Sequence, residues 1–182
     1  LRLAGLREGG VDAAPPERID FRRTVLDACQ LAGPRAREKG LVLEADVADE
    51  PAFILARQRD AVDIVENLLS NAIKYTEKGS VRLAAQPTDG RYRLTVTDTG
   101  IGIPEKDQAK LFTEFFRASN AKAADPHSSG LGLNILKAVI DRLGGSIRFT
   151  SREGEGTTFT VELPLAAKPA DADVPGSGPP PS

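Results

Sequence analysis

The chain has 182 residues, of which 40% are hydrophobic, and this is enough to form the core of one domain. A net charge of −2 argues against a general nucleic-acid-binding protein. The single cysteine, Cys29, excludes an internal disulfide framework and a metal site built from several cysteines, and no apolar run is long enough to cross a bilayer.

The organisation along the chain indicates one domain between two short flanking segments. The absence of any Met leads us to expect a piece of a longer protein. Residues 1–10 read as the end of a helix and 11–17 as a linker, followed by the domain over 18–165. Residues 166–182 are rich in Pro, Gly, Ala and Ser, which predicts a disordered tail.

Hydrophobic periodicity predicts a mixture of helices and strands. Helical spacing predicts helices over 24–39, 58–75 and 131–143, with a short amphipathic segment over 105–112. Alternation predicts strands over 19–21, 41–47, 51–56, 80–86, 92–98, 146–150 and 157–163. We expect 51–56 to pair antiparallel with 41–47, and 80–86 to form a hairpin with 92–98. Residues 117–129 have no period and are predicted to be a mobile loop. The pattern favours an α+β two-layer sandwich, with helices on one face of a mixed sheet.

The helix over 58–75 carries a line of polar residues, Asp63, Asn67, Asn71 and Lys74, on one face. Asn is a poor choice for a plain exposed helix face. Its amide oxygen suits Mg²⁺, which also binds phosphate oxygens, and a Lys one turn further on can contact those phosphates. The alternative is a solvated helix face without function.

A predicted strand runs into Asp98, and Gly100 and Gly102 follow at once. The carboxylate can accept a hydrogen bond from an exocyclic amine, and glycines allow a planar ligand to approach the backbone. The alternative is an ordinary turn at the end of a strand.

Two further stretches are compatible with phosphate binding. Gly130 and Gly132 precede a predicted helix, whose first N–H groups favour anions, although neither a P-loop nor a dinucleotide fingerprint is present. A capped helix start is the alternative. Arg117 begins the expected mobile loop and is placed to reach a terminal phosphate, whereas we assign Phe112 and Phe115 to core packing.

These motifs occur in one order, and together they resemble the N box, glycine boxes and F box of the ATP-binding catalytic domain of sensor histidine kinases. This is the Bergerat fold, shared with DNA gyrase, Hsp90 and MutL. The quoted boxes are Asn67-x-x-x-Asn71, Asp98-x-Gly100-x-Gly102, Phe112-x-x-Phe115, Gly130-x-Gly132 and Gly154-x-Gly156.

The resemblance implies a site for ATP and Mg²⁺. In it, Asn71 resembles the metal ligand, Asp98 the carboxylate that recognises the adenine amino group, and Thr158 a residue of the adenine pocket. Asn67 and Lys74 match phosphate-side positions, and we assign these two residues, together with Arg117, to catalysis. The nucleotide-binding positions implied are Asn67, Asn71, Lys74, Tyr75, Asp98, Gly100, Gly102, Gly130, Leu131, Gly132, Leu133 and Thr158.

One position discriminates within the superfamily. Members that hydrolyse ATP carry a Glu where Asn67 stands, and an Asn cannot take a proton from water. The resemblance therefore favours a protein-histidine kinase. A gyrase-type ATPase, an anti-sigma serine kinase and a non-catalytic interaction module are the alternatives.

The resemblance also implies partners outside the chain. The phosphoacceptor His is expected on a dimerisation domain, of which residues 1–10 resemble the last turns, because the only histidine, His127, lies in the expected loop. A response regulator receiver domain is the expected recipient of the phosphoryl group, and the full-length protein is expected to be a homodimer. We expect a cytoplasmic location for this part of the protein, with no contact to nucleic acid or membrane. The full-length protein is compatible with a membrane anchor elsewhere.

Overall fold

The computed structural model describes residues 15–125, 130 and 132–167. The helix end expected over 1–10, most of the expected tail, His127 and Leu131 lie outside these residues. The elements in chain order are β1 (Glu17–Asp20), α1 (Phe21–Glu38), β2 (Val42–Val47), β3 (Phe53–Ala56), α2 (Gln58–Tyr75), β4 (Ser80–Thr88), β5 (Arg91–Asp98), α3 (Glu105–Gln108), α4 (Ser119–Ala124), α5 (Gly132–Arg142), β6 (Ser146–Arg152) and β7 (Gly156–Pro164).

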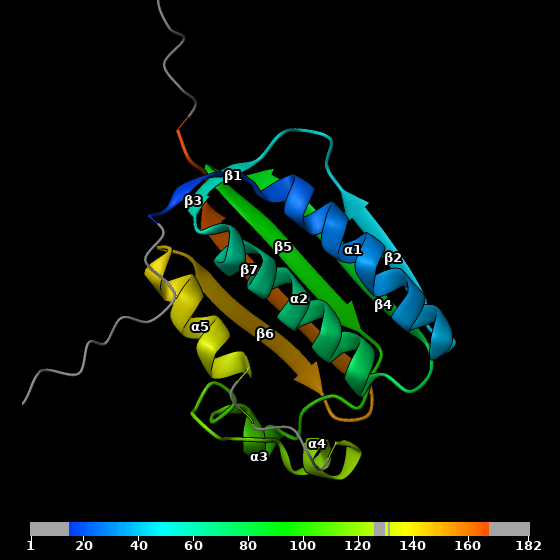
Figure 1. Ribbon diagram of the computed structural model, residues 1–182. Coiled ribbons are helices and arrows are strands. Elements are labelled where there is room, and N and C mark those ends of the chain that lie inside the picture. Colours follow the sequence, from blue (N-terminus) through cyan, green and yellow to red (C-terminus); the bar gives the residue numbers. More distant parts are fainter. Residues whose placement is uncertain (1–14, 126–129, 131, 168–182) are drawn as a thin grey trace, which may run out of the picture.

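Five strands form a mixed sheet in the order β2-β4-β5-β7-β6. Strands β2 and β4 are parallel, and the other neighbours are antiparallel. Helices α1, α2 and α5 lie on one face of this sheet (Figure 1). The α+β two-layer sandwich expected from the sequence is confirmed.

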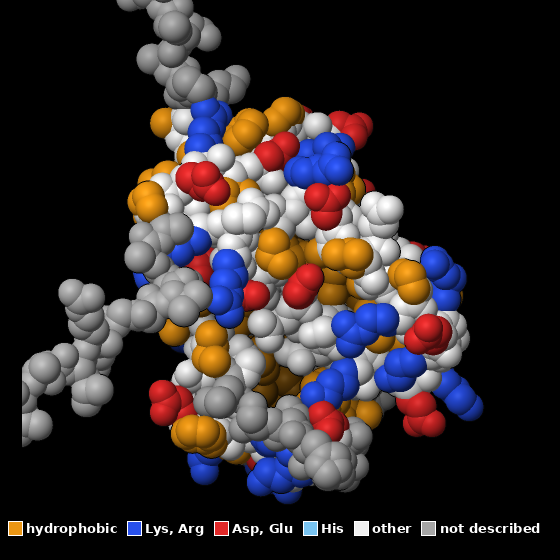
Figure 2. All heavy atoms as spheres, in the orientation of Figure 1, with side chains coloured by type: hydrophobic (Ala, Val, Ile, Leu, Met, Phe, Trp, Pro, Cys, Tyr) orange, Lys and Arg blue, Asp and Glu red, His pale blue; other side chains and the backbone are white. Residues whose placement is uncertain are grey.

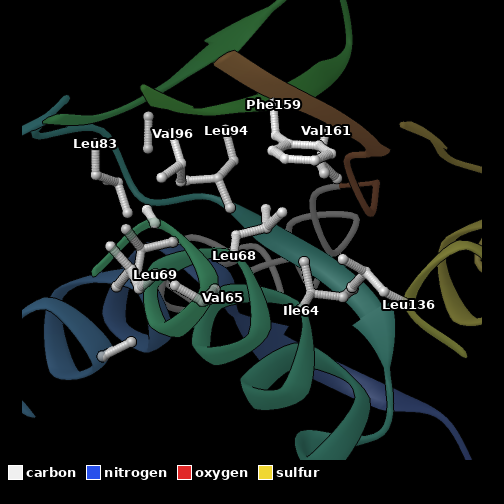
Figure 3. Packing of buried hydrophobic residues seen from close by; sticks show 14 of the residues in the cluster. Ile64, Val65, Leu68, Leu69, Leu83, Leu94, Val96, Leu136, Phe159 and Val161 are labelled. Carbon is white, nitrogen blue, oxygen red and sulfur yellow. The ribbon is translucent and has the colours of Figure 1, made fainter. Parts of the chain in front are cut away.

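The core fills the space between these helices and the sheet. Alternate residues of β5 are buried, namely Tyr92, Leu94 and Val96, as a half-buried strand requires. Figure 3 shows α2 facing the sheet, with Leu136 of α5 beside it. The labelled contacts come from Ile64, Val65, Leu68, Leu69, Leu83, Leu94, Val96, Leu136, Phe159 and Val161.

Helix α1 begins earlier than its periodicity predicts. The side chain of Asp20 accepts a hydrogen bond from the backbone N–H of Arg23 at 3.1 Å and so caps the helix. Phe21, expected at the end of a strand, is fully buried as the first helical residue. The cap therefore extends the helix by a turn at the expense of the strand.

The expected pairing of 51–56 with 41–47 is wrong. Strand β3 pairs instead with β1, and β2 lies parallel to β4. The reason is non-local, because α2 carries the chain back across the sheet and places β4 next to β2. The backbone N–H of Phe21 donates to the carbonyl of Ala52 at 2.8 Å and keeps the β3 segment at the start of α1.

The segment expected as an irregular loop over 117–129 contains a helix, α4. The carboxylate of Asp107 accepts hydrogen bonds from the backbone N–H and hydroxyl of Ser119, at 2.7 and 2.8 Å. The bond to the N–H satisfies a backbone donor that is otherwise unpaired at the start of α4. The sequence pattern did not reveal this start, because Asp107 lies twelve positions upstream.

The entry and exit of the described chain meet at one end of the sheet. Strand β1 pairs with β3, and the N–H of Ala166 donates to the carbonyl of Phe53 at 2.7 Å. In β5, Arg91 lies opposite Pro164 at this end, whereas Asp98 is at the far end. Asp98 thus lies a full strand length from the point where the chain enters and leaves.

Candidate nucleotide-binding site

A cleft lies at the far end of the sheet, between α2, the loop after β5, the α3–α4 region and the start of α5. Figure 2 shows a hollow here, with hydrophobic side chains at its back. The lining residues are Asn71, Ala72, Tyr75, Asp98, Ile101, Gly102, Ile103, Leu111, Phe116, Arg117, Ala118, Asn120, Ala121, Gly130, Gly132, Leu133, Thr157 and Phe159.

Asp98 is the acidic residue of this lining, and its two carboxylate oxygens differ. Oδ1 accepts backbone N–H groups from Gly100 at 2.9 Å and Thr157 at 3.2 Å. Oδ2 has no hydrogen-bond partner within the described part of the chain. Burial raises the pKa of Asp98, and the two hydrogen bonds offset part of this effect. The result is a fixed carboxylate with one acceptor oxygen to spare.

The glycines after Asp98 allow the loop to pack between two other segments. A Cβ at Gly100 would collide with the carbonyl oxygen of Tyr75. Gly102 has φ 62°, and a Cβ there would collide with the carbonyl of Arg152 in the β6–β7 hairpin. Both positions therefore require glycine, and the loop forms a wall of the cleft.

The polar line on α2 divides at the cleft. Asn71 and Tyr75 line it, and the amide of Asn71 makes no hydrogen bond with any described residue. Asn67 lies outside the lining, and its Nδ2 donates to the carbonyl of Asp63 at 3.1 Å. Its Oδ1 would lie 3.0 Å from a Cβ at Gly132, so α5 begins close beside Asn67.

The two cations expected near the phosphates both interact with Asp125. Lys74 Nζ lies 2.5 Å from a carboxylate oxygen of Asp125, outside the cleft lining. Arg117 lines the cleft and donates to the carbonyls of Ala121, at 3.1 Å, and Asp125. Burial lowers the pKa of Lys74, but the hydrogen bond with Asp125 and the contact with Tyr75 outweigh it and raise the pKa above its ordinary value.

The second glycine pair leads into α5 as expected. Gly130 has φ 74°, and a Cβ there would crowd the carbonyl of Phe116. Gly132, the first residue of α5, and Leu133 both line the cleft. Leu131, the remaining predicted residue of this stretch, lies outside the described residues.

Thr158, which was expected to line a pocket for adenine, is not among the residues that line the cleft. Its hydroxyl lies 3.1 Å from that of Thr97, its partner on β5. Successive residues of a strand face opposite sides of the sheet, so Thr157 and Phe159 face the cleft instead. Side chains alternate along β7, and Thr157 is the strand partner of Asp98, so Thr157 shares its face of the sheet. This alternation could have identified Thr157 as the residue that lines the cleft.

Phe115 is not a core residue, in contrast to the expectation. It is 70% exposed and has a left-handed backbone with φ 57°. Phe112 does pack as expected, with its ring 5.8 Å from that of Phe149, and Phe116 lines the cleft. Asn120 was also missed, because its place in the cleft depends on α4.

A family model matches residues 56–167, and its description is histidine kinase-, DNA gyrase B- and HSP90-like ATPase. The sensor histidine kinase AruS of Pseudomonas aeruginosa is 39% identical over 178 residues, which is 91% of this chain and 17% of AruS. The sensor-like histidine kinase SenX3 of Mycolicibacterium smegmatis is 41% identical over 164 residues, or 90% of this chain and 40% of SenX3. The chain therefore spans less than half the length of either relative.

Solved structures of similar proteins have the same fold. Full-length ShkA in complex with AMPPNP matches with a TM-score of 0.71 and 31% identity, over 84% of this chain and 32% of ShkA. The mycobacterial sensor histidine kinase MprB matches with a TM-score of 0.71 and 28% identity, over 82% of this chain and 98% of the MprB chain. Residues 56–167, which match the family model, contain all the lining residues of the cleft, and the chain belongs to the family of histidine kinase-, DNA gyrase B- and HSP90-like ATPases.

Proposed function

We propose that this chain is the ATP-binding catalytic region of a two-component sensor histidine kinase. The observation that carries the proposal is the carboxylate of Asp98, whose Oδ1 is held by two backbone N–H groups while Oδ2 has no hydrogen-bond partner in the described chain. The exocyclic amine of adenine is a donor that matches this acceptor. Ile101, Ile103 and Phe159 supply an apolar environment for the base.

The phosphates would extend from the base toward α2 and the start of α5. The amide oxygen of Asn71 fits Mg²⁺, because this ion prefers oxygen ligands and keeps several waters rather than requiring a cage of carboxylates. When bound with ATP, Mg²⁺ neutralises phosphate charge. Lys74 and Arg117 would contribute positive charge to the transferring group, with Asn67 beside the helix start at Gly132.

Transfer to a histidine agrees better with these residues than hydrolysis. A neutral imidazole already has a nitrogen lone pair that can attack the γ-phosphorus as the bond to the β–γ bridging oxygen breaks. Water would require a base, and the amide of Asn67 cannot accept its proton. Among the described lining residues, Asp98 carries the carboxylate, and adenine would occupy it by donating a hydrogen bond.

The proposal includes partners beyond the chain. The phosphoryl group would pass to a His on a dimerisation domain and then to the receiver domain of a response regulator, within a homodimeric parent. No helix among the described residues has the length and apolar character needed to span a membrane. We place this region in the cytoplasm, with no nucleic-acid or membrane contact of its own.

Calorimetric titration with ATP, with and without Mg²⁺, tests the proposal. We expect binding by the unsubstituted chain and at least tenfold weaker binding by Asp98→Asn, because hydrogen bonds to a charged group contribute about 1.5–3 kcal/mol. Asp46→Asn is the matched control, since Asp46 is an exposed carboxylate on β2 whose pair with Arg82 is 3.4 Å long. It should leave the affinity unchanged.

A transfer assay distinguishes the remaining possibilities. Mixed with a histidine-containing dimerisation domain from a relative, the chain should form an acid-labile phosphoryl group on that domain, and Asp98→Asn should not. Steady release of phosphate without transfer would favour a gyrase-type ATPase. Failure of the unsubstituted chain to bind ATP would favour an interaction module and refute the proposal.

A further inference from the structure

Ser151 of β6 lies outside the cleft but binds two segments that form it. Its Oγ accepts the backbone N–H of Ile103 at 2.8 Å. The same Oγ lies 3.0 Å from the carbonyl oxygen of Gly156 and 2.8 Å from the hydroxyl of Thr157. A hydroxyl has one proton and two lone pairs, so Ser151 donates to Gly156 and accepts from both Ile103 and Thr157.

The bond to Gly156 is significant because its carbonyl and the N–H of Thr157 belong to one peptide unit. That N–H donates to Oδ1 of Asp98 at 3.2 Å. Ser151 therefore holds the oxygen end of the peptide whose nitrogen end binds Asp98. Hydrogen bonds in such a chain polarise one another, so the bond at the carbonyl strengthens the bond at the N–H.

The bond to Ile103 holds the loop that follows Asp98. Ile103 follows Gly102 in the loop after Asp98, and both residues line the cleft. The amide of Gln108 braces the same point by donating to the carbonyls of Ile103, at 3.0 Å, and Ser151, at 3.2 Å. One hydroxyl thus relates the position of the loop to the orientation of the Asp98 carboxylate.

The position of Ser151 in its strand is consistent with a dedicated role. Alternate residues of β6 are less exposed than their neighbours, and those preceding Ser151 in this row are Ile147 and Phe149. A serine interrupts this apolar row at the point where the strand passes the Asp98 loop. Packing alone would favour another apolar residue here.

We propose that Ser151 is a positioning residue that sets the preference of the cleft for a base with an exocyclic amine. Without its hydroxyl, the 156–157 peptide and the loop at Ile103 lose their common anchor. The spare oxygen of Asp98 then no longer has one fixed direction. This inference rests on the proposed function, because it assumes that ATP occupies the cleft.

The test compares ATP with purine riboside triphosphate, which lacks only the 6-amino group. Calorimetry on the whole chain gives the dissociation constant of the analogue divided by that of ATP. We expect Ser151→Ala to lower this ratio three- to tenfold, by weakening the binding of ATP while leaving that of the analogue unchanged. Ser151→Thr keeps a hydroxyl and should restore the ratio.

Two further variants keep the result interpretable. Thr150→Ala changes the adjacent residue, which faces away from the Ser151 row, and should leave the ratio unchanged. If Ser151→Ala does not fold, Ser151→Cys is measured in its place, since a thiol has the same shape as the hydroxyl, although it is larger, and is a weak hydrogen-bonding group. An unchanged ratio, or equal weakening of both nucleotides, would overturn the inference while ATP binding by the unsubstituted chain kept the proposed function. No ATP binding by that chain would overturn both.

Discussion

The amide of Asn71 is a neutral oxygen donor at the wall of the cleft, without a hydrogen bond to any other described residue. Substituting Asn71 by Ala should therefore remove the proposed metal ligand and leave the proposed base pocket intact. We expect Mg²⁺ to tighten ATP binding to the unsubstituted chain, and Asn71→Ala to reduce this gain about tenfold, or ~1.4 kcal/mol. Titrations with and without Mg²⁺ measure the gain directly.

The control for Asn71 is its neighbour on α2. Ser70 lines a separate groove between α1 and α2, and its hydroxyl bonds the carbonyl of Asn67 at 3.2 Å. Ser70→Ala should keep the full Mg²⁺ effect. Equal loss in both variants would mean that α2 is disturbed generally, and the ligand role of Asn71 would be rejected.

The errors in the sequence-based prediction of single residues arose where a shift of one position, or one backbone angle, changes the side of the molecule that a side chain faces. Asp98 and Gly102 were predicted at the cleft and line it, because strand alternation and backbone freedom are local properties, whereas Gly100, also predicted there, is not among the lining residues. Thr157 was missed by one position, which in a strand means the opposite face. Phe115 was assigned to the core because it is hydrophobic, but its side chain is exposed and its backbone is left-handed. No pattern in the sequence indicates this backbone conformation.

At the scale of elements, α4 brings a carboxylate to the predicted phosphate side of the cleft. Asp125 follows α4 and pairs with Lys74, and their side chains are 27% and 34% exposed. In the proposed site, a phosphate that contacts Lys74 would share its ammonium with this carboxylate, whose negative charge repels the phosphate. Asp125 would therefore oppose the binding of the nucleotide there.

Removing the charge of Asp125 should strengthen nucleotide binding. We expect Asp125→Asn to tighten Mg²⁺-ATP binding two- to fivefold, since partly exposed ion pairs contribute about 0.2–1 kcal/mol. The gain should shrink in high salt, which screens the pair. Asp141→Asn, which breaks the exposed pair with Lys137 on α5, is the control and should change nothing. Weaker binding by Asp125→Asn would show that Asp125 supports the site rather than opposing the binding of the nucleotide.

Elements defined by local signals were predicted best. Helix α2 was expected over 58–75 and has these bounds, because its apolar stripe is regular. The β4–β5 hairpin followed from two alternating runs around a short turn. The β2–β4 pairing and the start of α4 depend on contacts between distant parts of the chain, so no local pattern contains them.

At the scale of the whole molecule, stability depends on the layer between the helices and the sheet. Leu68 is 1% exposed at the centre of this layer (Figure 3). Leu68→Ala should cost about 2–5 kcal/mol of unfolding free energy, because it removes buried methyl groups and leaves a cavity. Urea denaturation should show a lower midpoint with an unchanged slope.

Leu31 provides the matched substitution on the surface. It lies on α1 with 68% of its area exposed, so Leu31→Ala should change the unfolding free energy by less than about 0.5 kcal/mol. Similar losses in the two variants would contradict the assignment of the core to the helix–sheet layer.

The described chain enters and leaves the domain at one end of the sheet, and the cleft lies at the other end. A rotation of the whole domain about the first end therefore displaces the cleft. Strand β5 has eight residues from this end to Asp98, and the seven steps between them span roughly 23 Å at about 3.3 Å per residue. A rotation of about 10° about this end would then move the cleft by roughly 4 Å without altering any contact inside the domain. A small change in the angle between this domain and a proposed partner domain would thus bring a bound nucleotide toward that partner or withdraw it.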